Sequence, residues 1–107
     1  MKDAVVIVAR EAGAAAALAP VARALIDDRE VRVTIVASDE AARAFERQGL
    51  PVLGFPDDPD EQQIDWLLTR EGAIGLLTGT SVYPDRDARW WNAGASRGVP
   101  SLALVDH

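Results

Sequence analysis

Short apolar segments alternate along this chain with segments of helical periodicity, and this alternation constrains the possible fold most strongly. Four apolar runs without polar alternation cover residues 5–9, 31–37, 74–77 and 102–105, and a shorter one covers 52–55. Runs rich in Val, Ile and Leu are typical of strands covered on both faces, as in parallel sheets. We therefore predict an α/β domain with a doubly wound, five-stranded parallel sheet in a three-layer α/β/α arrangement.

The first helical segment carries its apolar residues at i, i+3, i+4, i+7 and i+8, the spacing of one helix face. These residues are Leu18, Val21, Ala22, Leu25 and Ile26. Pro20 lies inside the segment. Because proline lacks an N–H and is tolerated best in the first helical turn, the regular helix is expected to begin near it.

Capping residues delimit the next two helices. Ser38 is a candidate N-cap of the second helix, and this helix is expected to end at Gly49. For the third helix, Asp60 and Gln63 fit a capping box, and the helix is predicted to end at Gly72.

The strand order can be predicted from the short run at 52–55, which Pro51 precedes and Pro56 follows. Proline at the ends of a strand suits the edge of a sheet, which favours the order 3-2-1-4-5. The fifth strand would then be an apolar free edge, which proteins usually cover. We expect a homodimer or another partner to cover it.

Composition excludes several kinds of site. The chain has 107 residues, a formal net charge of −6, no cysteine and a single histidine, His107. Thiolate chemistry and Cys- or His-rich metal sites are excluded, and no metal is expected. Nucleic acid is not an expected partner, since a positive patch would be needed. No apolar run is long enough to span a membrane, so a cytoplasmic protein is expected.

Ligands of open α/β sheets bind outside the carboxyl ends of the strands, at the point where the strand order reverses. Here that crevice would lie between the loop that contains Gly13 and the loop at 78–81, with Asp106 nearby. The first loop lacks the glycine patterns of dinucleotide sites and P-loops, so no cofactor is predicted. The candidate ligand-binding residues are Gly13, Gly79, Thr80, Ser81 and Asp106; no catalytic residue can be assigned.

Two further features have an ordinary structural interpretation. Asp58-Pro59-Asp60 is an Asp-x-Asp sequence, which holds a metal in some glycosyltransferases, but here a solvated turn with a helix cap is favoured. Trp90 and Trp91 lie on a helix predicted over about 87–97. Because they occupy successive positions, one is expected to face the core and the other the surface.

The residues also resemble a known superfamily. Gly13, the Leu-Ala-Pro-Val-Ala-Arg-Ala-Leu sequence at 18–25, the strand at 31–36 and the Gly-Leu-Pro-Val sequence at 49–52 are similar to the N-terminal, Rossmann-like domain of GT-B-type glycosyltransferases and nucleotide-sugar 2-epimerase-like proteins. The segments 77–81 and 97–107 are similar to a later β-α-β unit of that superfamily. The resemblance implies an acceptor site, whose residues would correspond best to Gly13, Thr80 and Ser81.

The resemblance also implies parts that these 107 residues do not contain: a donor-binding second domain or subunit, and further strands. We therefore expect 1–107 to be a single domain from a larger two-domain architecture, a glycosyltransferase-like acceptor-side part that is inactive alone and whose partner is a sugar or other small acceptor. Two alternatives remain open. One is a dimerising interaction module that uses the fifth strand and the Trp90/Trp91 helix, and the other is a small anionic-ligand binding domain that uses 78–81.

Overall fold

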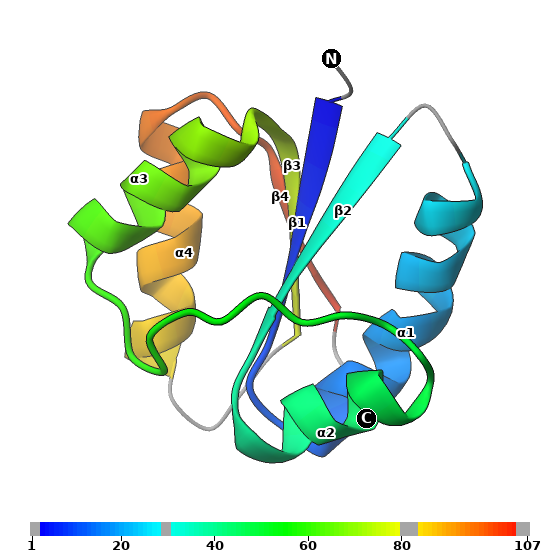
Figure 1. Ribbon diagram of the computed structural model, residues 1–107. Coiled ribbons are helices and arrows are strands. Elements are labelled where there is room, and N and C mark those ends of the chain that lie inside the picture. Colours follow the sequence, from blue (N-terminus) through cyan, green and yellow to red (C-terminus); the bar gives the residue numbers. More distant parts are fainter. Residues whose placement is uncertain (1–2, 29–30, 80–83, 105–107) are drawn as a thin grey trace.

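Strands and helices alternate in the computed structural model, which describes residues 3–28, 31–79 and 84–104. A parallel sheet lies between two helical layers (Figure 1), so the α/β class and the three layers are confirmed. The elements are β1 (Asp3–Ala9), α1 (Ala12–Asp27), β2 (Val31–Ala37), α2 (Asp39–Arg47), α3 (Glu61–Glu71), β3 (Ala73–Gly79), α4 (Pro84–Ser96) and β4 (Ser101–Leu104).

The sheet of the described residues has four strands in the order β2-β1-β3-β4. All neighbouring pairs are parallel; Val5 is paired with Val33, and Leu77 with Leu102. The prediction of five strands in the order 3-2-1-4-5 is therefore wrong, because 52–55 forms no strand.

The segment 52–55 lies beside β2 but makes a single parallel bridge with it, between Leu53 and Val36. The Leu53 N–H donates to the Ile35 carbonyl at 2.8 Å. Pro51 and Pro56 have no N–H to extend a ladder. The apolar character of the segment instead serves packing, since Leu53 and Phe55 contact the core.

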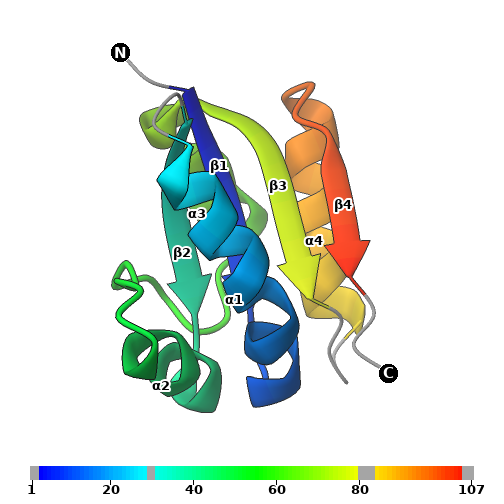
Figure 2. The same cartoon turned by 90° about the vertical axis from the view of Figure 1, so that its right-hand side faces the viewer.

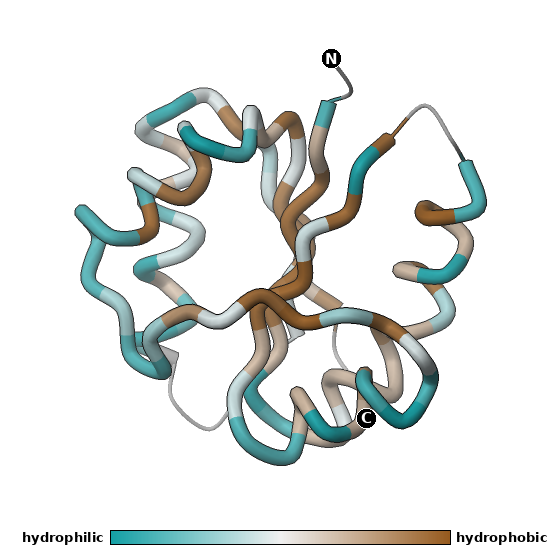
Figure 3. Tube along the Cα trace, in the orientation of Figure 1, coloured by the Kyte–Doolittle hydropathy of each residue, from teal (hydrophilic) through white to brown (hydrophobic). Residues whose placement is uncertain are grey.

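Two hydrophobic clusters hold the layers together. On one face, α1 and α2 cover a cluster that includes Ile7, Leu18 and Phe45. On the other face, α3 and α4 cover a cluster that includes Leu67 and Trp90. The most hydrophobic parts of the chain lie along the central strands (Figure 3). Each fully buried side chain of this size stabilises the fold by about 1.5–3 kcal/mol.

The first helix begins earlier than expected. It covers Ala12–Asp27, with Pro20 in its interior. Proline leaves the carbonyl four residues earlier, that of Ala16, without its helical partner. Ala16 and Pro20 are both exposed, so water can hydrate that carbonyl, and the helix continues because Leu18 and Ala22 are buried on its other side.

The predicted helix ends are mostly confirmed. The capping box of α3 is present, since the Gln63 N–H donates to Asp60 Oδ1 at 2.8 Å and the Asp60 N–H donates to Gln63 Oε1 at 2.9 Å. Gly72 ends α3 with a φ of 65°, a value that favours glycine. The helix α2 follows Ser38, although that side chain makes no capping hydrogen bond. The helix α4 begins at Pro84, a few residues before the predicted start.

The edge strand β4 is open on the side of α1. Figure 2 shows α1 in front of the sheet centre and no labelled helix in front of β4. Leu102 on β4 is 58% exposed. None of the helices in the described ranges has the length and apolar character needed to cross a membrane.

Candidate functional site

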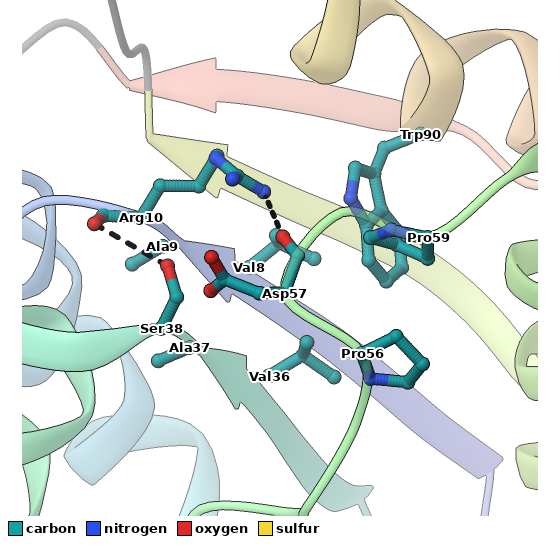
Figure 4. A pocket seen from close by; sticks show the side chains of 10 residues that line it. All are labelled: Val8, Ala9, Arg10, Val36, Ala37, Ser38, Pro56, Asp57, Pro59 and Trp90. Atoms are coloured by element: carbon teal, nitrogen blue, oxygen red, sulfur yellow. Dashed lines mark hydrogen bonds between the residues drawn. The ribbon is translucent and has the colours of Figure 1, made fainter. Parts of the chain in front are cut away.

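A small cavity opens at the carboxyl ends of β1 and β2. Its floor comes from the strand ends, and its wall comes from the loop before α3 and from α4. The lining residues are Val8, Ala9, Arg10, Val36, Ala37, Ser38, Pro56, Asp57, Pro59 and Trp90 (Figure 4). Its volume is about 10 Å³, close to the roughly 10–15 Å³ that one water molecule requires. The cavity is therefore the floor of a crevice and does not enclose a substrate.

Arg10 supplies the positive charge of this crevice. It follows β1 directly, and its Nη1 donates to the Asp57 carbonyl at 2.6 Å. Its buried Nε has no hydrogen-bond partner among the described residues. An unpaired buried donor is costly and is rarely left without a partner. A water or a ligand oxygen in the cavity would complete the hydrogen bonding of this guanidinium.

The neighbouring strand end is joined to Arg10. The Ser38 N–H donates to the Ala9 carbonyl at 3.3 Å, and Ser38 Oγ donates to the Arg10 carbonyl at 3.5 Å. The next residue, Asp39, has a φ of 44°, a conformation that is uncommon outside glycine. The start of α2 is thus held in a strained conformation at the edge of the crevice, and such strain is concentrated at functional sites.

The two tryptophans of α4 have different roles. Trp90 is 2% exposed and lines the cavity, where its ring lies 6.0 Å from that of Phe55. Trp91 is half-buried, and its Nε1 donates to Thr78 Oγ1 at 2.9 Å. The prediction that one tryptophan faces the core is confirmed for Trp90. Trp91 is not a fully exposed side chain, because it anchors α4 to β3.

Two of the five candidate ligand-binding residues lie among the described residues, and both are at the end of the sheet where the strands have their carboxyl ends. Gly13 lies exposed in the first turn of α1, and Gly79 ends β3. A Cβ on Gly79 would lie well under 3.0 Å from the Cβ of Ala14, so close packing of α1 on β3 explains this glycine. Thr80, Ser81 and Asp106 lie outside the described residues, and the predicted ligand site remains a prediction.

The Asp-x-Asp sequence has the structural role that was favoured. Asp60 caps α3, and Asp58 lies 2.7 Å from Arg89 Nη1 and 3.4 Å from Arg86 Nε. Both ion pairs tie the loop to α4. Within 3–28, 31–79 and 84–104, no group of three or more acidic or histidine side chains could hold a metal ion.

The path of the 56–59 loop beside the ends of β1 and β2 could not be predicted from the sequence. Arg10 recognises a backbone carbonyl there, and a carbonyl has no residue-specific signature. An arginine directly after a buried strand, with a proline-bounded loop later in the chain, was the available signal.

The parallel sheet, the helices on both faces and the crevice at the strand ends define a Rossmann-like α/β domain. The sequence matches no family model and no curated protein. A solved structure with a similar fold is UDP-GlcNAc 2-epimerase from Neisseria meningitidis bound to UDP-GlcNAc, with a TM-score of 0.71 and 12% identity. The match covers 94% of this chain and 32% of the epimerase chain. The chain therefore shares its fold with part of the epimerase and spans about a third of the epimerase's length.

Proposed function

We propose that this chain is the acceptor-side, Rossmann-like part of a GT-B-type enzyme acting on sugars, and that it is inactive alone. The observation that carries the proposal is the fold match over 94% of the chain to an enzyme solved with a nucleotide sugar. The crevice at the carboxyl ends of β1 and β2 would be one wall of the site.

The chemistry of the crevice supports an anionic or sugar ligand. Helices that connect parallel strands begin at the carboxyl edge, so the N-termini of α1 and α2 lie beside Arg10. Helix N-termini carry partial positive charge and favour anions. Arg10 adds a full charge with an unused buried donor, and a guanidinium suits phosphate oxygens. A nucleotide sugar offers such oxygens together with sugar hydroxyls.

The cavity is too small to enclose a sugar nucleotide by itself, which supports a site completed by a second domain or subunit. A volume of about 10 Å³ admits one water, whereas ligand pockets typically enclose about 300–1,000 Å³. A sugar nucleotide would therefore lie across the mouth of the crevice, between this domain and a donor-binding domain or subunit. Weak binding and no sugar transfer are expected of the 107 residues alone.

The proposal is tested by an NMR titration of the chain with UDP-GlcNAc. Arg10→Gln removes the charge and should raise the Kd about tenfold or more, since a hydrogen bond to a charged group contributes about 1.5–3 kcal/mol. Arg43→Gln, on the exposed surface of α2, is the matched control and should leave the Kd unchanged. Equal affinities of the wild type and Arg10→Gln would refute a role of this crevice in binding.

The open β4 edge favours a second candidate, an interaction module. A groove of about 330 Å³ runs between α1 and β4 and is lined by apolar side chains that include Leu25, Leu77 and Leu102. An exposed apolar strand edge is a surface that proteins usually cover. The expected result for this candidate is a dimer in sedimentation equilibrium that Leu102→Asp converts to a monomer. A wild-type chain that stays monomeric at high concentration would reject it.

A further inference from the structure

An exposed tryptophan stands on α3, away from the β4 edge. The buried stripe of this helix is formed by Ile64, Leu67 and Leu68, which are each at most 2% exposed. Trp66 lies outside the stripe and is 55% exposed. A large exposed aromatic side chain contributes little to the core, and such residues often mark binding surfaces.

The Trp66 ring is held in place by its neighbours. The guanidinium of Arg70, one helical turn later, lies 5.1 Å from the ring centroid, a cation–π distance. Asp65 makes a two-point hydrogen bond with Arg97, the residue directly after α4, and this contact lowers the pKa of the Asp65 carboxyl. The helix that carries Trp66 is thus fixed to α4. A ring whose helix is fixed and whose conformation is restricted by a neighbour loses less entropy when a ligand stacks on it.

A groove lies beside Trp66 and has a volume of about 460 Å³. It is lined by Gly54, Phe55, Pro56, Asp60, Gln62, Gln63 and Trp66. Arg70 instead lines the neighbouring groove, with Trp66 as the ridge between the two. The Arg70 guanidinium thus lies over the indole on the side of its own groove, and Trp66 also lines the Phe55 groove.

The polar side chains of the groove are partly preorganised. The capping box fixes Asp60 and Gln63, and it uses Oδ1 of Asp60 and Oε1 of Gln63. These bonds leave Oδ2 of Asp60 and the amide NH₂ of Gln63 for a ligand, and Gln62 adds a second exposed amide. Pro56 lines both this groove and the Arg10 crevice, so the two sites are adjacent.

We propose that this groove binds the neutral ring of a sugar, stacked on Trp66. The C–H face of a pyranose is weakly positive and fits the negative face of an indole. Neighbouring hydroxyl groups of a sugar ring need hydrogen-bond donors and acceptors close together. The side-chain amides of Gln62 and Gln63 and the carboxylate of Asp60 provide both. The inference takes its substrate class from the proposed function and identifies the groove as the subsite for the acceptor sugar.

The surroundings favour a sugar over a protein segment. Protein hot spots are packed aromatic residues enclosed by contacts that exclude water. Around Trp66 the two grooves also contain Gly54, Phe55 and Pro56, but most of their lining residues are Gln, Asp, Thr and Arg. The volume of about 460 Å³ also lies within the range of small-molecule sites.

The test is an NMR titration with N-acetylglucosamine and its β-1,4-linked disaccharide, observed through the indole N–H signals. We expect the Trp66 signal to shift and the Trp90 signal to stay, because Trp90 is buried. Trp66→Ala should weaken binding about tenfold, the effect of losing one aromatic contact, and Trp66→Phe should restore part of it. Ile74→Ala is the control, since Ile74 is also a large exposed apolar side chain, 48% exposed, and lies outside the groove.

The outcomes separate this inference from the proposed function. Sugar binding that Arg10→Gln leaves unchanged and Trp66→Ala weakens about tenfold supports the groove, even if UDP-GlcNAc does not bind at the crevice. Gln62→Ala should also weaken binding, and because Gln62 is exposed this variant guards against a folding defect. Unchanged sugar affinity in folded Trp66→Ala would overturn the inference. A saccharide that shifts no Trp66 signal would also overturn it. So would a Trp66→Ala variant that loses self-association but keeps its affinity for the sugar.

Discussion

Gly79, at the end of β3, packs so closely against α1 that a single methyl group should destabilise the domain. A Cβ on Gly79 would lie well under 3.0 Å from the Cβ of Ala14 and 3.3 Å from its Cα. Ala14 is 1% exposed and lies in the first turns of α1. The obstacle is thus a helix backbone and not a flexible side-chain end, and Gly79→Ala must displace α1 from the sheet.

The magnitude follows from the cost of overpacking. Inserting a methyl group into a packed core costs about 1–3 kcal/mol, and the upper value applies where backbone must move. Replacing Gly by Ala also restricts the unfolded chain, which offsets about 0.4–1 kcal/mol. We therefore expect Gly79→Ala to lower the free energy of unfolding by about 2 kcal/mol. For a domain of this size the corresponding fall in Tm is about 8–16 °C.

Gly75 provides a matched control on the same strand. Its Cβ would meet Val5 Cγ2 at 3.9 Å, an ordinary contact. Gly75→Ala should therefore be neutral or stabilise by about 0.4–1 kcal/mol. Urea unfolding followed by circular dichroism measures both variants. If Gly79→Ala is as stable as Gly75→Ala, the packing explanation of Gly79 is wrong.

Two further predictions concern α3. Asp60→Ala removes the capping box and should lower the free energy of unfolding by about 1 kcal/mol, while exposed Glu61→Ala should change it less; equal effects in urea unfolding would contradict the capping role. Asp65 has a pKa lowered from 3.8 by its hydrogen bond with Arg97, so its stabilising contribution is present above about pH 4 and is lost as the pH falls through its lower folded value. Asp65→Asn should therefore show a smaller loss of Tm than the wild type between pH 5 and pH 2, and parallel curves would contradict this.

The sequence predicted the layers well because they depend on patterns that burial dictates. Unalternated apolar runs gave the four observed strands, and the spacing of Ile64, Leu67 and Leu68 gave the buried face of α3. The same apolar signal was misleading at 52–55, where Leu53 and Phe55 are apolar because they pack on the core. Pro20 was misleading because Ala16, whose carbonyl it leaves without a helical partner, is exposed and can be hydrated.

The candidate sites were harder to predict for a different reason. The Arg10 crevice depends on a long-range contact, from a side chain to the Asp57 backbone 47 residues later, and local periodicity contains no such information. The Trp66 groove depends on the path of the loop at 54–56 beside α3. The position of Trp66 outside the buried stripe was the available sequence signal.

The most direct test of the central claim is a crystal structure of the chain with UDP-GlcNAc. Our account predicts phosphate oxygens within hydrogen-bond distance of the Arg10 guanidinium, at the carboxyl ends of β1 and β2, with the Trp66 groove left open for the acceptor sugar. A nucleotide sugar bound at a different edge of the sheet, with the Arg10 crevice holding only water, would contradict it.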